Sequence, residues 1–463
     1  MSFIIYDLAF LFLFTLFVII FLYRRRNKID REGILFLYRT KLGIKFINYI
    51  GKKYKRTLNI LQYFSIIIGY VLMIGIIFII VQSVYVYITF PEITKLIKAP
   101  PIAPVIPYFP RIFGLQSFFP EFYFTYFLVS ILIVAVVHEF THGFFARAKN
   151  LKIKSTGFAF IGPIIGAFVE PDEQKMNKKP KVDQLAILSG GVFANTITAI
   201  IFFIIMASFF SYAYSPAGVK FNDYSYTILN SSEIEEINSS VVLPVNGINL
   251  TKATAHDKTY FINPEHLKEE KLIAYKAYED TPALNAGLKG AIIKINDIPI
   301  RNLSELSFEL AKYSPNDSIK ITTFVDGEES EFQVILSQNP KNASAGYLGI
   351  VIFSIEDIRG FRSLMLKIIS VFKDPNLRYV ANSNQNLADF IYYLFWWITI
   401  INALVALFNM LPAGIFDGGR FFFLTVLALT KSEKVAKKSY KIATYIILLS
   451  FLLLLVIWLF RMF

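Results

Sequence analysis

Long apolar stretches separated by short polar or basic loops dominate this chain. A helix needs roughly 20 apolar residues to cross a bilayer. Six stretches are long enough, at residues 3–23, 61–90, 122–147, 184–212, 387–411 and 443–460, and a shorter apolar piece follows the fifth at 421–429. The pattern predicts a polytopic α-helical membrane protein with about six transmembrane helices.

Two segments between these stretches have a different pattern. Residues 155–170 are apolar, but Gly157, Gly162 and Pro163 interrupt them, so we expect a β-hairpin that dips into the membrane. Its strand edges cannot face lipid and must lie against protein or water. The basic stretch 24–56 contains apolar pieces at 33–38 and 44–50, which predicts an amphipathic segment lying on the membrane surface.

From about residue 215 to residue 345 the chain turns polar, with short strands and turn residues. Within it, residues 271–337 hold a Pro-Ala-x-x-Ala-Gly-Leu turn, a strand, an Asn-Asp hairpin and a helix at 303–313. This order resembles a PDZ domain. We therefore expect an α+β PDZ-like extracytoplasmic domain, and the division is 1–57, 58–212, 213–345 and 346–463.

Composition supports a membrane protein. Hydrophobic residues make up 55% of the chain and charged residues 17%, against about 45–50% and about 25% in soluble domains. The net charge of +13 comes from short loops beside apolar stretches, as the positive-inside rule describes. We expect no nucleic-acid binding, which would need a basic stripe on a soluble domain. With no cysteine, a disulfide, a thiolate nucleophile and a Cys-based zinc site are all excluded.

The third apolar stretch ends in His138-Glu139-Phe-Thr-His142. On a helix this spacing places two imidazoles one turn apart on the same face, which suits zinc, and Glu139 can serve as general base toward a water on the metal. A catalytic zinc needs a third protein ligand. Asp417 lies in apolar surroundings at the same membrane depth, although Asp417 alone can equally be a helix N-cap.

The other acidic and imidazole groups are weaker candidates. His256 and His266 fall in the polar domain, far from the third stretch, and we interpret them as surface residues. Asp7 interrupts the first apolar stretch, and we expect it near the outer interface without a functional role.

These motifs occur in a recognisable order. His138-Glu-x-x-His142, Gly191-x-x-x-Asn195, and Asn409-x-x-Pro412 leading to Asp417-Gly418 together resemble the site-2 protease family of intramembrane zinc metalloproteases. One departure is Phe416, where that family usually has leucine. The resemblance implies His138, His142 and Asp417 as zinc ligands and Glu139 as catalytic base. It also implies Asn195 as a catalytic residue that steadies the substrate or the oxyanion.

The resemblance further implies hydrolysis of peptide bonds within or near transmembrane segments. The expected partners are the lipid bilayer and a single-span protein that another protease has already trimmed, with the PDZ-like domain as a size filter. The expected location is the plasma membrane of a prokaryote, with the active site toward the cytoplasm. Two alternatives stay open: a catalytically silent PDZ-bearing receptor or chaperone, and a membrane zinc protease that cuts soluble tails at the cytoplasmic face.

Overall fold

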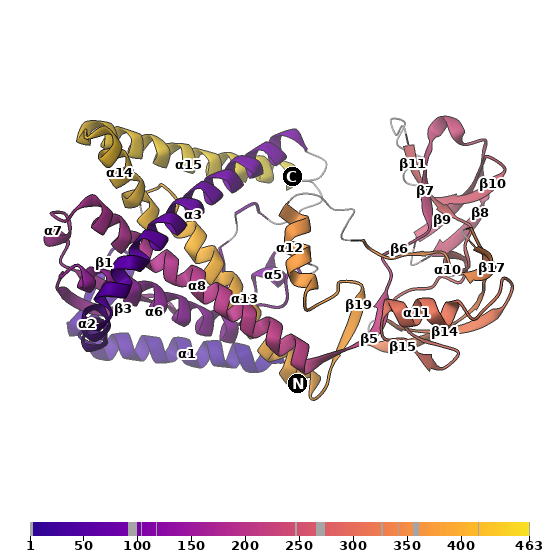
Figure 1. Cartoon of the computed structure of the whole chain (residues 1–463), viewed down its shortest axis with the longest axis horizontal. Helices are drawn as coiled ribbons and strands as arrows, with labels where there is room; N and C mark the ends of the chain where they lie inside the picture. The colour runs from indigo at the N-terminus through magenta and orange to yellow at the C-terminus, as the bar shows by residue number, and fades with distance from the viewer. Residues whose placement is uncertain are drawn as a thin grey trace. The chain divides into compact units, whose positions relative to one another are not determined.

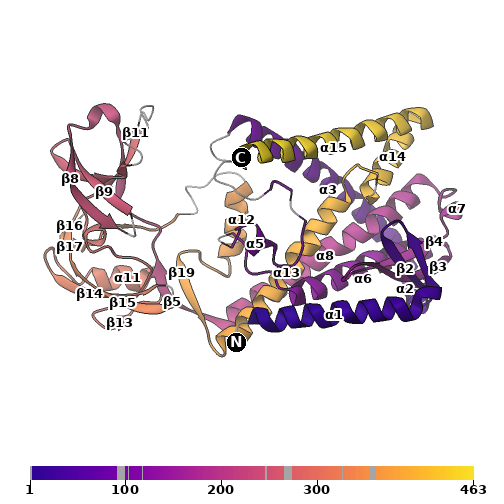
Figure 2. The same ribbon diagram turned by 180° about the vertical axis from the view of Figure 1, so that it is seen from behind.

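The computed structural model divides the chain into two compact units, residues 1–206 with 390–463, and residues 207–389 (Figures 1 and 2). It describes residues 3–90, 100–102, 104–116, 118–245, 248–264, 274–325, 327–340, 342–354, 361–414 and 416–462. The second unit extends beyond residue 345, since it includes a helix and a strand that our division placed with the membrane core.

Among the residues that the structure describes, six helices, which lie mainly in the first unit, are long and apolar enough to cross a membrane. They are α1 (Phe3–Arg25), α3 (Lys55–Thr89), α6 (Phe124–Ala148), α8 (Lys181–Ala213), α13 (Gln385–Asn409) and α15 (Glu433–Met462). The shorter helices are α2 (Ile44–Lys53), α5 (Phe109–Ile112), α7 (Glu173–Met176) and α14 (Asp417–Thr430), with a 3-10 turn η1 (Arg26–Lys28). Each predicted span is confirmed as a helix, and the apolar piece at 421–429 lies within α14.

A four-stranded antiparallel sheet accompanies these helices, in the order β1 (Ile29–Glu32), β2 (Leu35–Thr40), β3 (Ile153–Ile161), β4 (Ile164–Pro171). The β3–β4 hairpin confirms the β-hairpin predicted for residues 155–170, whereas its insertion into the membrane stays a prediction. Residues 33–38, predicted as part of an amphipathic segment on the membrane surface, belong to a β1–β2 hairpin that turns at Gly33, where φ is 61°. Strand β2 continues the sheet by pairing Phe36 with Phe160. Strand β4 is left as an edge, and it lies along α6.

Helix α2 packs against the end of α6. Ile47 is fully buried there. Gly143 provides the space, because a Cβ at that position would lie 2.9 Å from an Ile47 methyl carbon. The apolar piece at residues 44–50 therefore lies in a helix that packs against α6 through Ile47, and its place on the membrane surface stays a prediction.

Buried charged residues hold both ends of α6. At its start, Asp7 of α1 is only 1% exposed. Its carboxylate accepts hydrogen bonds from the backbone N–H groups of Phe124 (2.7 Å) and Thr125 (2.9 Å), the Thr125 hydroxyl (2.6 Å) and the Tyr108 hydroxyl (2.5 Å). Asp7 thus caps α6 from another helix, a structural role that we did not predict, and its place near the outer membrane interface stays a prediction.

At the other end, Lys149 follows directly after α6 and its side chain is 10% exposed. Its ammonium donates to Asn59 (2.9 Å) and Gln62 (2.5 Å) on α3. It also pairs with Asp183 (2.9 Å) at the start of α8. The end of α6 is therefore attached to α3 and α8 by one cation.

The second unit contains two larger sheets. One has the strand order β7 (Tyr226–Asn230), β11 (Ala274–Glu279), β10 (Lys258–Ile262), β9 (Ile248–Ala255), β8 (Glu236–Val245); the other runs β15 (Glu328–Ile335), β14 (Ser318–Val325), β12 (Ala291–Ile295), β5 (Tyr214–Lys220), β19 (Leu377–Ala381), with β13 (Ile298–Pro299) paired to β12. The remaining elements are β6 (Asp223–Tyr224), η2 (Ser231–Glu233), α10 (Pro282–Asn285), α11 (Leu303–Leu310), β16 (Ser337–Asn339), β17 (Asn342–Tyr347), β18 (Ile350–Val351) and α12 (Phe361–Ser370). The turn, strand and helix order predicted for 271–337 is present, although residues 271–273 and 326 lie outside the described residues.

Candidate active site

Helix α6 carries the first three candidate residues. Its regular spacing directs the His138 and His142 side chains to the same side, with ring centroids 4.6 Å apart. Both rings are removed from solvent, with 8% and 12% of their side-chain surfaces exposed. The two Nε2 atoms lie 3.0 Å from each other. The helix therefore presents two nitrogen ligands in a protected interior.

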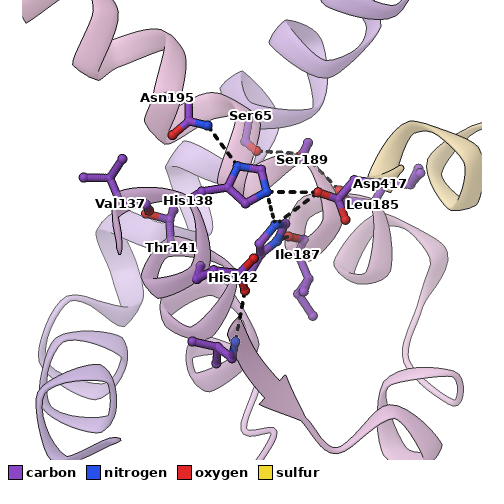
Figure 3. Close-up of polar contacts among 12 residues, drawn as sticks. Ser65, Val137, His138, Thr141, His142, Leu185, Ile187, Ser189, Asn195 and Asp417 are labelled. Atoms are coloured by element: carbon purple, nitrogen blue, oxygen red, sulfur yellow. Dashed lines mark hydrogen bonds and ion pairs between the residues drawn. The ribbon is translucent and has the colours of Figure 1, made fainter. Parts of the chain in front are cut away.

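Asp417 joins the histidines from the start of α14 (Figure 3). Its Oδ2 lies 3.2 Å from Nε2 of His138 and 3.2 Å from Nε2 of His142. The alternative interpretation as an N-cap is wrong, because Phe416 occupies the N-cap position and Asp417 is the first helical residue. The motif also contains Ile415, which lies outside the described residues.

Gly418 explains why an Asp-Gly pair occurs here. The chain folds back on itself between α13 and α14, and a Cβ at residue 418 would lie 2.6 Å from the Leu411 carbonyl oxygen. That separation is too short for any side chain, so glycine lets the start of α14 approach the end of α13. The close approach brings Asp417 to the depth of the histidines.

Helix α8 forms the wall beside both rings. A Cβ at Gly191 would lie 2.5 Å from Nε2 of His142 and 2.6 Å from Cε1 of His138, so only glycine fits. One turn further along, the amide of fully buried Asn195 lies 3.0 Å from Nδ1 of His138. Nδ1 of His142 lies 2.6 Å from the carbonyl oxygen of Ile187. Helix α8 thus contacts the outer nitrogen of each imidazole.

The three ligand atoms suit one metal ion. The His and Asp ligand atoms all lie within 4.8 Å of one another. Zinc bonds of about 2.0–2.1 Å in a tetrahedral arrangement separate neighbouring ligand atoms by about 3.3 Å, which is close to the 3.2 Å found from Asp417 to each imidazole. Two imidazole nitrogens and a carboxylate oxygen are also a donor set that zinc accepts. His138, His142 and Asp417 can therefore hold a metal.

Glu139 lies beside this group and faces the sheet. Its carboxylate accepts a hydrogen bond from the backbone N–H of Val169 on β4, at 3.0 Å. No pattern in the sequence indicates this contact or the one to the Ile187 carbonyl, since both involve backbone groups on other elements. His256 lies exposed in the turn between β9 and β10 with φ of 53°, and His266 lies outside the described residues.

Comparisons with known proteins agree with this geometry. The profile of peptidase family M50 matches residues 126–455. A relative described as "Uncharacterized protein MJ0971", from Methanocaldococcus jannaschii, is 28% identical over 272 residues, covering 56% of this chain and 67% of the relative. A second relative, "Serine protease Do-like HtrA" from Lactococcus lactis, is 25% identical over 114 residues, covering 24% of this chain and 28% of that protein.

The family match covers most of the chain and includes the helices that carry His138, His142, Asn195 and Asp417. It begins just after the start of α6, so α1, α2 and α3 lie before it. The predicted resemblance is thereby confirmed. The chain belongs to peptidase family M50 and is a membrane metalloprotease.

Proposed function

We propose that this protein is a zinc-dependent intramembrane endopeptidase that hydrolyses peptide bonds within or near the transmembrane segments of membrane-anchored proteins. The observation that carries the proposal is the position of Glu139. Its carboxylate stands between the His138–His142–Asp417 group and the edge strand β4, to which it is bonded through Val169. A base placed beside both a metal site and a strand edge can act on a peptide held along that edge.

The residues divide the chemistry among themselves. Zinc held by His138, His142 and Asp417 would polarise the scissile carbonyl and lower the pKa of a water to about 7. Glu139 takes a proton from the attacking water as the new C–O bond forms. It then gives that proton to the amine nitrogen as the C–N bond breaks, so the carboxylate is restored.

Strand β4 offers a way to hold the substrate. A helical transmembrane segment hides its peptide groups, so the segment must unwind before cleavage. Backbone groups alternate between the two sides of an antiparallel strand. Since the Val169 N–H points away from β3 toward Glu139, the N–H groups of Ala167 and Ile165 also point to the free edge. An unwound substrate can pair there by strand addition.

A proline at Ala167 tests this step. Proline removes the outward N–H without removing a bond to β3, and edge strands tolerate it. We expect Ala167→Pro to lower cleavage of a transmembrane substrate about tenfold or more, in line with about 1.4 kcal/mol per lost backbone bond. Ala167→Val, which keeps the N–H, should leave cleavage near wild type. Unchanged cleavage by the proline variant would remove strand addition from the proposal.

Zinc content and cleavage together test the central proposal. Glu139→Gln should keep its zinc and lose about 10²- to 10⁴-fold in cleavage rate, because only the base is removed. Asp417→Asn should lose zinc. Wild-type protein that binds zinc but cleaves none of a varied set of membrane substrates would favour the silent receptor. Cleavage confined to soluble tails would favour the alternative protease, and undiminished zinc in Asp417→Asn would overturn the ligand assignment.

We also propose that the second unit is a PDZ-like size filter that admits only substrates already trimmed by another protease. The order of α10, β12, β13 and α11 supports this, because it follows the PDZ-like pattern. Tyr214 and Ala381 pair across β5 and β19, so residues 215–380 can be replaced by a short Gly/Ser loop between neighbouring ends. The filter predicts faster cleavage of untrimmed substrate and unchanged cleavage of trimmed substrate; equal slowing of both would contradict it.

The basic loops support an active site toward the cytoplasm of a prokaryotic plasma membrane. The chain has no cysteine, so single cysteines report their own side of the membrane. Lys152→Cys, after α6, should be protected from an impermeant maleimide in intact cells. His256→Cys in the second unit should react, and the opposite pattern would reverse the orientation.

A further inference from the structure

The outer nitrogens of the two histidines have different partners on α8 (Figure 3). His142 Nδ1 lies 2.6 Å from the Ile187 carbonyl oxygen, whereas His138 Nδ1 lies 3.0 Å from the Asn195 amide. A carbonyl oxygen can only accept a hydrogen bond, so Nδ1 of His142 carries the hydrogen. Its Nε2 then holds the lone pair that a metal needs. The tautomer of His142 is therefore fixed by the backbone carbonyl of Ile187.

His138 must have the same tautomer to bind the same metal. Its Nε2 lies as close to Asp417 as that of His142, at 3.2 Å, so Nε2 is the nitrogen directed at the shared site. A ligating Nε2 requires the hydrogen on Nδ1, and Nδ1 then needs an acceptor. Asn195 is the group in reach, and an asparagine can supply either an acceptor oxygen or a donor nitrogen.

Because Asn195 is buried, it matters which atom of its amide faces His138. Its side chain is fully buried, and its Oδ1 has no hydrogen-bond partner among the residues that the structure describes. The oxygen and nitrogen exchange places when the amide turns by 180°. With Nδ2 facing the ring, two donors would oppose each other and the amide oxygen would stay buried without a bond. With Oδ1 facing the ring, the hydrogen on Nδ1 and the amide oxygen satisfy each other.

We propose that Asn195 is a positioning residue whose Oδ1 accepts the Nδ1–H of His138 and thereby fixes the metal-binding tautomer of that ligand. This rests on the proposed function in one respect, namely that His138 ligates zinc. It replaces the role that the resemblance implied, in which Asn195 contacts the substrate or the oxyanion. Helix α8 then sets both tautomers, one through the Ile187 carbonyl and one through a side chain.

The two roles differ in which substitutions at residue 195 they tolerate. As an acceptor for Nδ1–H, Asn195 can be replaced by aspartate, whose oxygens accept equally well. As a donor to an oxyanion, it cannot, because aspartate has no N–H and repels negative charge. Asn195→Leu has a similar volume and removes both capacities. Thr196→Val is the matched control, since the Thr196 hydroxyl donates within α8, to the Val192 carbonyl at 2.8 Å.

The experiment measures Zn²⁺ affinity of the full-length protein in detergent by competition with a chromophoric chelator, alongside cleavage and thermal melting. We expect Asn195→Leu to bind zinc about 10- to 100-fold more weakly while melting as a folded protein. Asn195→Asp should recover most of the zinc affinity and cleavage that Asn195→Leu loses, and Thr196→Val should change neither. The visible spectrum of the Co²⁺-loaded protein should shift in Asn195→Leu and not in Thr196→Val.

Other outcomes overturn the proposal. Wild-type zinc affinity in Asn195→Leu, with cleavage lowered about 10²- to 10³-fold, would make Asn195 an oxyanion donor instead. Loss of cleavage in Asn195→Asp with zinc retained would likewise assign it to the oxyanion. If wild-type protein itself binds no zinc, the proposed function fails, which is a different result from failure of this inference.

Discussion

The two ends of α6 are held in opposite ways. At the start, the Asp7 carboxylate from α1 meets backbone N–H groups of Phe124 and Thr125. At the end, Lys149 reaches out to Asn59, Gln62 and Asp183 on α3 and α8. A negative charge at the start of a helix and a positive charge at its end both interact favourably with the helix dipole. The helix that carries the metal ligands is thus held at each end by a charge whose sign suits that end of the helix dipole.

The partners of these two charges differ, and this difference determines which end of α6 is more sensitive to loss of its charge. Asp7 accepts from N–H groups at the start of a helix, which have no partner inside that helix. Lys149 bonds polar side chains, of which Asp183 keeps 22% of its side-chain surface exposed. Removing the anion leaves several donors at a helix start unsatisfied, whereas removing the cation leaves one buried acceptor, Gln62, and a charge on Asp183 that water still reaches. We therefore expect the start of α6 to be the more sensitive end.

Asp7→Ala should give the largest effect. It leaves the buried Phe124 N–H and the partly buried Thr125 N–H and Tyr108 hydroxyl without an acceptor, which should cost roughly 3 kcal/mol of unfolding free energy. Asp7→Asn keeps one acceptor oxygen and should lose about half as much. Unfolding in detergent, followed by loss of helical circular dichroism, measures both. Wild-type stability in Asp7→Ala would show that α1 is merely an anchor.

Lys149→Met should have a smaller effect. The methionine fills the space of the lysine stem, and the remaining loss of about 1–2 kcal/mol comes from unpaired Asp183 and Gln62. Adding Asp183→Asn should restore part of the stability, because residue 183 then carries no unpaired charge. If Lys149→Met proves as damaging as Asp7→Ala, partner exposure does not decide the order of the two ends.

An exposed ion pair sharpens the contrast with these buried charges. Hydrogen bonds from Arg39 and Ser155 hold the pKa of Glu170 below its ordinary value of 4.5. A carboxyl with a lowered pKa in the folded state stabilises the protein above the unfolded pKa, and this contribution is lost as the pH falls through the folded value. Because Arg39 and Glu170 remain 33% and 40% exposed, we expect less than about 1 kcal/mol.

The loss should appear between roughly pH 5 and pH 3 and should shrink in high salt, which screens exposed charges. Arg39→Gln should remove most of this part of the pH dependence, and Ser155→Ala a smaller part. A pH profile of unfolding that is identical in Arg39→Gln and wild type would show that the pair contributes nothing.

Local patterns could be predicted from the sequence, whereas contacts between residues far apart in the chain could not. The apolar stretches predicted the six long helices, and His138, His142 and Asp417 were found because their residue types and order are specific. The Asp7 cap was missed because its partners lie far along the chain. A carboxylate inside an apolar stretch was nevertheless a signal that it has a partner. The β1–β2 hairpin was also missed, although the turn residue Gly33 followed by the short apolar run at residues 34–38 favoured a strand.

The smallest effect we predict is coupling between the two ends. Asp7 and Lys149 are separated by the length of α6, whose 25 residues span roughly 37 Å. Changes that far apart with no shared partner usually add to within about 0.5 kcal/mol. The double variant Asp7→Asn with Lys149→Met should therefore lose the sum of the single losses, whereas Lys149→Met with Asp183→Asn should not add.

Additivity of Asp7→Asn with Lys149→Met would mean that the two ends of α6 are stabilised independently. Each end would then position the metal ligands between them without the other. Coupling above about 1 kcal/mol would instead mean that α6 shifts as one rigid body when either end is released. The zinc affinity of the single variants separates these cases. A rigid shift moves His138 and His142 against α8 and weakens zinc from either end, while independent anchoring weakens it mainly from the Lys149 end, which lies closer to His142.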